Sequence, residues 1–137
     1  MKRFSTRSLT TLALFGIILA ASSAHAAENI EFLDPTNNAT VTVGPGNTRM
    51  KVKFKTNNGF NPLQASLRLS GGTATLDSEF SFDGITAEYT AEFSITTSGT
   101  YSNSSVKILA KKDADSGGNP IQYDTLEVTG ITVTKQQ

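Results

Sequence analysis

The chain has 137 residues, with 12 Lys and Arg against 12 Asp and Glu, one histidine and no cysteine. A nucleic-acid partner would call for a basic surface, which this balance does not supply. The single histidine is His25, so the residues after it lack both His and Cys. That composition excludes zinc, copper and haem ligation in their usual forms, and any histidine-assisted nucleophile.

The first 26 residues have the three parts of a secretory signal peptide, namely a basic start, an apolar run and a small-residue cleavage site. These parts lie at Lys2 to Arg7, Leu9 to Ala21, and Ala24 to Ala26. The apolar run is shorter than the roughly 20 residues that a membrane-spanning helix needs. We therefore expect a leader at 1–26, a mature domain at 27–137, a periplasmic or secreted location and no membrane span after cleavage.

Removal of the leader would change the size and charge of the chain. Without 26 of the 137 residues, 111 remain, and the loss of Lys2, Arg3 and Arg7 leaves nine basic residues against twelve acidic ones. The mature charge is then −3, which again disfavours nucleic acid. A chain of this size can bury one core without disulfides.

Most of the mature sequence alternates apolar and polar residues with a period of two, the pattern of half-buried strands. The clearest stretch is 49–56, where Met50, Val52 and Phe54 alternate with basic residues. In chain order, strands are expected at 30–33, which resumes at 40–43, and then at 49–56, 63–70, 73–76, 85–96, 106–111 and 121–134, with a weaker strand at 79–82. Turn residues separate them, including a loop at 57–62 that is too rich in Asn, Gly and Pro to pair in a sheet. A change of phase at Thr129-Gly130 predicts a β-bulge.

Seven or eight short strands punctuated by turns indicate an all-β, antiparallel two-sheet sandwich. Three motifs resemble bacterial immunoglobulin-like domains: an opening strand that leads to a proline turn (30–41), Gly99-Thr100-Tyr101, and a late strand that runs to Asp113 before Gly118-Asn119. The pattern departs from the family in the four residues 102–105 and in an extra residue before Asp113. The resemblance implies a single exported domain with a binding, spacer or adhesion role rather than an enzyme.

The basic row Arg49, Lys51, Lys53 and Lys55 has two interpretations. It could bind an anionic surface such as a phosphorylated or sulfated glycan. Alternatively, the strand pairs antiparallel with the 85–96 strand and meets Glu88 and Glu92 on the outer face, which is the interpretation we favour.

Asp113, Asp115 and Asp124 have part of the spacing of a calcium loop, with Gly118 at the glycine position. The fit is partial because Gly117 stands where an oxygen ligand is needed and Asp124 where a bidentate Glu is usual. Asp and Gly are also ordinary turn residues. We therefore expect no cofactor, with calcium as the one candidate that an experiment should test.

In an immunoglobulin-like topology the loops 57–62 and 112–120 lie at one end of the sandwich. Asn57, Asn58 and Phe60 from the first loop and Asn119 from the second are then candidate ligand-binding residues. An exposed aromatic beside amides and carboxylates suits sugars or peptides. The alternative is that Phe60 is a buried anchor of its loop.

The sequence therefore predicts a non-catalytic binding module that recognises a protein or carbohydrate, at the cell surface or in the periplasm, through its loops or an edge strand. The alternative is a structural or adhesive subunit that self-associates by edge-strand pairing, with or without calcium.

Overall fold

The computed structural model describes residues 28–76 and 80–137, which form nine strands. The strands are β1 (Ile30–Asp34), β2 (Thr40–Val43), β3 (Met50–Thr56), β4 (Asn61–Leu69), β5 (Gly72–Leu76), β6 (Ser81–Asp83), β7 (Glu88–Ser94), β8 (Gly99–Lys112) and β9 (Gln122–Lys135). The predicted leader at 1–26 and its cleavage site lie outside the described residues, as does the start of the strand expected at 79–82.

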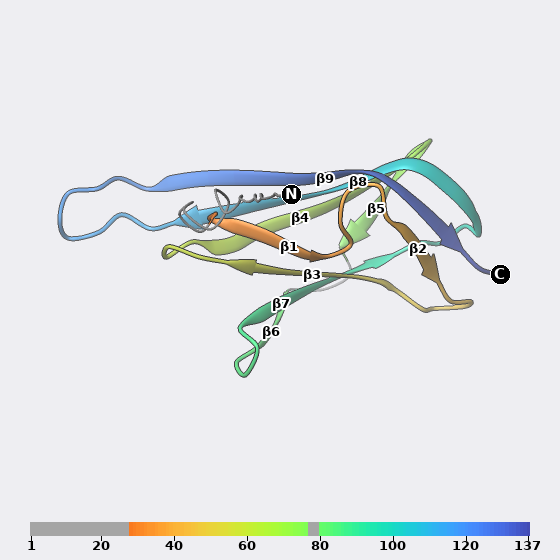
Figure 1. Ribbon diagram of the computed structural model, residues 1–137, viewed down its shortest axis with the longest axis horizontal. Helices are drawn as coiled ribbons and strands as arrows, with labels where there is room; N and C mark the ends of the chain where they lie inside the picture. The colour runs from red at the N-terminus through yellow and green to blue at the C-terminus, as the bar shows by residue number, and fades with distance from the viewer. Residues whose placement is uncertain (1–27, 77–79) are drawn as a thin grey trace, which may run out of the picture.

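The strands form two layers (Figure 1). One layer contains β1, β3, β7 and β6, and the other contains β4, β8, β9 and β2, while β5 pairs with both β4 and β7. All the described pairings are antiparallel except that of β2 with β9. This is the arrangement of an immunoglobulin-like sandwich, so the predicted fold class is confirmed. The chain exceeds the predicted seven or eight strands in part because Pro35 separates β1 from β2, and the two pair with different layers.

The core lies between the two layers. Met50, Val52 and Phe54 of β3 are buried, as their alternation predicts. The ring of Phe54 stacks on that of Tyr89 from β7, with the centroids 5.5 Å apart, and meets the edge of Phe80 at 5.7 Å. Burial of one such aromatic side chain contributes roughly 1.5–3 kcal/mol.

The basic side of β3 faces acidic residues on the neighbouring strands. Lys51 lies directly opposite Glu92 of β7, and Lys55 lies opposite Glu31 of β1. A guanidinium nitrogen of Arg49 is 3.7 Å from a carboxylate oxygen of Glu92. Cross-strand charge pairing with Glu92 is therefore confirmed. Glu88 is opposite Asp83 of β6 on the other side of β7, and the β3–β7 register ends at Tyr89, so pairing of the basic row with Glu88 stays a prediction.

Residues 102–105, at which the sequence departs from the immunoglobulin-like pattern, lie inside β8. The β8–β9 register shifts between Tyr101 and Ser104 and again between Ser104 and Val106. On β9 the predicted bulge is present at Thr129-Gly130, where Gly130 has a φ of 70°. Each strand contributes one extra residue, so Val106 again faces Val128 and the ladder continues.

Several bounds of the predicted strands are wrong, and the strand expected at 106–111 already begins at Gly99 as β8. Asn61 and Pro62 belong to β4 rather than to a loop, opposite Lys111 and Ala110. A register shift between Pro62 and Gln64 accommodates the proline within the ladder. The strand expected at 85–96 begins only at Glu88, because Ala87 is exposed, with a φ of 59°, in the turn before β7.

Candidate functional site

The β3–β4 loop and the β8–β9 loop lie at the same end of the sandwich, which we call the loop end. Asn61 at the start of β4 is opposite Lys111 near the end of β8, and Lys112 is opposite Gln122 at the start of β9. Figure 1 shows the β8–β9 hairpin extending beyond the other strands at this end.

Asn29, just before β1, joins the two sides of the loop end. Its side-chain oxygen accepts a hydrogen bond from the Asn58 amide, and its side-chain nitrogen donates to Asp124 of β9, both at 2.9 Å. Its backbone carbonyl accepts from the N–H of Asn57, also at 2.9 Å. Sequence reasoning missed Asn29 because its bonds reach residues that are distant along the chain.

Phe60 is not the exposed aromatic that the sequence predicts, because only 7% of it is accessible. Asn58 and Gly59 both have positive φ, which turns the chain back so that the Phe60 ring points into the core. The Phe60 N–H donates to the Asn57 carbonyl at 3.1 Å. Phe60 is therefore the anchor of the loop, and the exposed aromatic residue at this end is Tyr123, which is 61% accessible.

An open depression of about 570 Å³ lies between the two sides of the loop end. Its lining residues are Asn29, Asn58, Phe60, Lys112, Gln122, Tyr123 and Asp124. The predicted residues Asn58 and Phe60 are therefore brought together here, whereas Asn57 and Asn119 are not part of the lining. An exposed tyrosine beside amides, an amine and a carboxylate provides one apolar platform and several hydrogen-bonding groups.

Asn119 serves the β8–β9 loop itself. Its side-chain amide and its backbone N–H both donate to the Asp115 carboxylate, at 2.8 and 3.1 Å, and the Gly117 N–H donates to it at 2.9 Å. These bonds, the amide of Asn119 first, lower the pKa of Asp115 from its ordinary 3.8. The loop is therefore organised internally by a turn centred on Asp115.

The three predicted calcium ligands are not gathered into one site. Asp113 lies 3.3 Å from the Lys111 amine, Asp115 accepts the loop bonds, and Asp124 accepts from Asn29 and from the N–H of Thr125. Within residues 28–76 and 80–137, no group of three or more acidic side chains is arranged to hold a metal ion. Calcium binding stays a prediction without support from this geometry.

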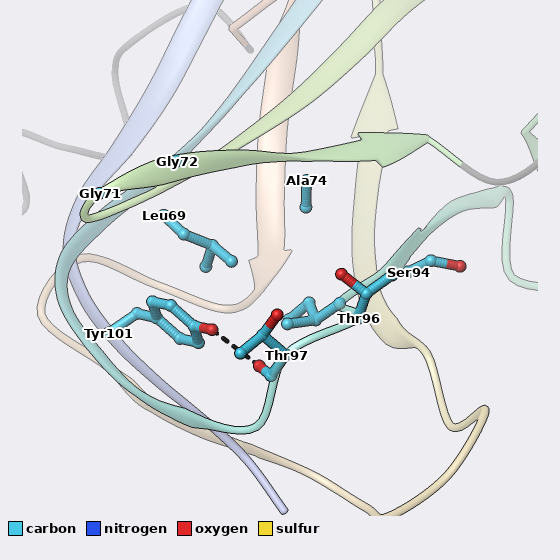
Figure 2. Close-up of a pocket in the computed structure, with 9 residues that line it drawn as sticks. Leu69, Gly71, Gly72, Ala74, Ser94, Thr96, Thr97 and Tyr101 are labelled. Carbon is cyan, nitrogen blue, oxygen red and sulfur yellow. Dashed lines mark hydrogen bonds between the residues drawn. The ribbon is translucent and has the colours of Figure 1, made fainter.

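A second depression, of about 260 Å³, lies at the opposite end of the sandwich, between the β4–β5 turn and the β7–β8 connection. Figure 2 shows Leu69 and Ala74 on one side of it and Thr96 and Thr97 on the other. The Tyr101 hydroxyl donates to the Thr97 carbonyl at 2.7 Å. This bond is the tyrosine corner of immunoglobulin-like sandwiches, so we assign Tyr101 to the fold.

Comparison with known proteins gives likenesses of fold only. No protein-family model matches the chain, and no curated protein matches it. Among solved structures, the cysteine protease inhibitor EhICP2 from Entamoeba histolytica has 16% identity and a TM-score of 0.38, over 73% of this chain and 87% of that one. The titin M3 domain has 12% identity and a TM-score of 0.39, over 81% and 100%. Likenesses this distant say nothing about ligand or partner.

The part of the chain that the structure describes has no helix long and apolar enough to cross a bilayer.

Proposed function

We propose that this chain is an exported, non-catalytic binding module that holds a protein or carbohydrate ligand at its loop end, in the periplasm or outside the cell. The observation that carries the proposal is the open depression in which Tyr123 stands exposed beside Asn58, Lys112 and Gln122. Tyrosine supplies contact area at low entropic cost, and the polar groups around it fix the orientation of a ligand.

The loop end is also pre-organised. The Asn29 bonds to Asn58 and Asp124 fix one side of the depression, and the Asp115 turn shapes the loop beyond the other side. A ligand then loses less free energy to the ordering of the protein, which supports binding at this end rather than a mobile linker role.

The proposal is tested by screening the purified chain against an array of immobilised glycans and a library of random peptides. For any glycan or peptide retained, Tyr123→Ala should weaken binding by about 1–2 kcal/mol, or roughly 5–30-fold, because a central aromatic contact is lost. Asn58→Ala should also weaken it. Phe82→Ala, which removes an exposed aromatic outside the depression, is the matched control and should leave affinity unchanged.

Retention that neither Tyr123→Ala nor Asn58→Ala weakens would contradict binding at the depression. Failure to retain any glycan or peptide would contradict the binding function itself.

A second candidate function is a structural subunit that pairs with copies of itself along a sheet edge. It is favoured by β9, because the first half of this strand has no strand partner on its outer side among the described residues.

A further inference from the structure

Four of the other strands with an open edge each carry a feature that discourages pairing with another chain. β1 is five residues long and irregular between Phe32 and Asp34, and β2 is only four residues long. β4 contains Pro62 at a register shift, and β6 has three residues. Short edges, prolines and irregular registers all disfavour the addition of a strand.

The open part of β9 has none of these features. β2 pairs only with the stretch from Thr132 to Lys135. The seven residues from Gln122 to Val128 are paired with β8 in an unbroken register, include no Pro, Gly or Lys, and have no partner strand on the other side within the described ranges. Figure 1 shows this stretch along the upper margin of the sandwich, with no described strand above it.

The hydrogen bonds identify which backbone groups point to the open side. The Thr129 N–H donates to the Asn37 side chain and its carbonyl accepts from the Asn38 N–H, so Thr129 is directed away from β8. The Thr125 N–H likewise donates to the Asp124 side chain. Since backbone direction alternates along a strand, Tyr123, Thr125 and Glu127 all direct their N–H and C=O groups outward.

We infer that this edge pairs antiparallel with the same edge of a second copy, about a two-fold axis at Thr125. This register pairs the whole open stretch with itself and places Tyr123 opposite the second copy's Glu127. No two charges of like sign then face each other directly. The inference rests on the second candidate function and specifies its edge, register and partner.

The lysines of β8 complete the complementarity of this register. Lys107 lies opposite Glu127 and Lys111 lies opposite Tyr123 on the exposed face. Across the two-fold axis, each Tyr123–Glu127 pair would have one lysine on each side. The layer that contains β4, β8 and β9 in one copy would then join the same layer of the second copy, and the two would form one continuous sheet through the β9–β9 contact.

A single cysteine tests the register, because the chain has none of its own. In an antiparallel pair whose members direct their N–H groups at each other, the Cα atoms are about 5.5 Å apart, which a disulfide can bridge. The chain is expressed at full length, purified, and exposed to a mild oxidant. Thr125→Cys should form a covalent dimer, whereas Ser66→Cys, exposed on β4 of the same layer, should remain monomeric on a non-reducing gel.

Sedimentation velocity over a range of concentrations tests the strand pairing itself. The unmodified chain and Thr125→Val should both dimerise, because the valine keeps the outward N–H. Thr125→Pro removes that N–H without removing a bond to β8, and should weaken dimerisation at least about tenfold. Far-UV circular dichroism checks that Thr125→Pro is folded. If it is not folded, the comparison of Thr125→Cys with Ser66→Cys tests the pairing instead.

An unmodified chain that is monomeric throughout would overturn both this inference and the second candidate function. Dimerisation that persists in Thr125→Pro, without self-crosslinking of Thr125→Cys, would overturn only the assignment to β9. If this edge pairs with a strand of a different protein, Thr125→Cys will form no homodimer. That result would show that the partner is not a second copy of this chain. The loop-end proposal stands or falls on the Tyr123 and Asn58 variants instead.

Discussion

At the scale of single residues, the fold depends on a few positions where the backbone conformation and the surrounding space leave little choice. Gly130 has a φ of 70°, and a Cβ at this position would collide with the side-chain oxygen of Asn38. Asn38 also donates its N–H to Thr129, so the bulge of β9 and the β1–β2 connection fit each other at this point.

Gly130→Ala should therefore destabilise the chain by more than the backbone strain alone. Gly71 is the matched control, because its φ of 82° is similar but a Cβ there would meet nothing within 4 Å. We expect Gly71→Ala to lower the free energy of unfolding by about 1–2 kcal/mol, and Gly130→Ala to lower it further, since Asn38 must move. Urea unfolding of the two variants measures the difference. Equal losses would contradict a tight fit at Gly130.

Asp115 makes the β8–β9 loop sensitive to acid. Its pKa is lowered in the folded chain, so its contribution to stability is present above the ordinary value of 3.8 and is lost as the pH falls through the lower, folded value. The melting temperature of Asp115→Asn should lie below that of the unmodified chain at neutral pH, and the two should converge in acid. A constant difference across this range would mean that the charge of Asp115 has no part in the turn.

At the scale of elements, the alternating sequence of β3 gives the strand one apolar face toward the core and one basic face on the outside of the sheet. Its apolar residues enter the core, while its basic residues meet Glu31 and Glu92 on the neighbouring strands. These pairs fix the register of β3 against β1 and β7, because a slip of one residue would turn the basic side toward the core.

The Arg49–Glu92 pair should contribute modestly to this register. A double-mutant cycle with Arg49→Ala and Glu92→Ala should give a coupling of about 0.2–1 kcal/mol, because both side chains are partly exposed. The coupling should shrink in high salt as the charges are screened. Thermal unfolding of the four proteins gives the cycle. A coupling that salt leaves unchanged would show that the contact is not electrostatic.

At the scale of the whole molecule, the two ends of the sandwich differ in their chemistry. The loop end exposes Tyr123 and Ile121, whereas at the opposite end the Tyr101 hydroxyl of the tyrosine corner bonds to the connection between β7 and β8. The molecule thus has one end built for stability and one with exposed side chains available for contact.

Calcium should not stabilise the chain, because Asp113, Asp115 and Asp124 are apart and engaged with other groups. The measurement is thermal unfolding with excess calcium and then with a chelator. A real site filled to about 100 times its dissociation constant would add roughly 2.7 kcal/mol, an upward shift on the order of 10 °C for a domain of this size. Such a shift, abolished by Asp115→Asn, would assign the loop to metal binding.

The sequence by itself determined the fold class, the core face of β3, and the bulge at Thr129-Gly130. These features follow from local periodicity and glycine chemistry, which a single strand displays without its neighbours. It also placed Asn58 near the candidate site. Only the tertiary structure decided that Phe60 is buried, that Tyr123 is the exposed aromatic residue of the loop end, and that Asn29 joins its two sides. Those facts depend on packing and hydrogen bonds between residues far apart in the chain, and the order of the amino acids does not record which loop will cover which side chain.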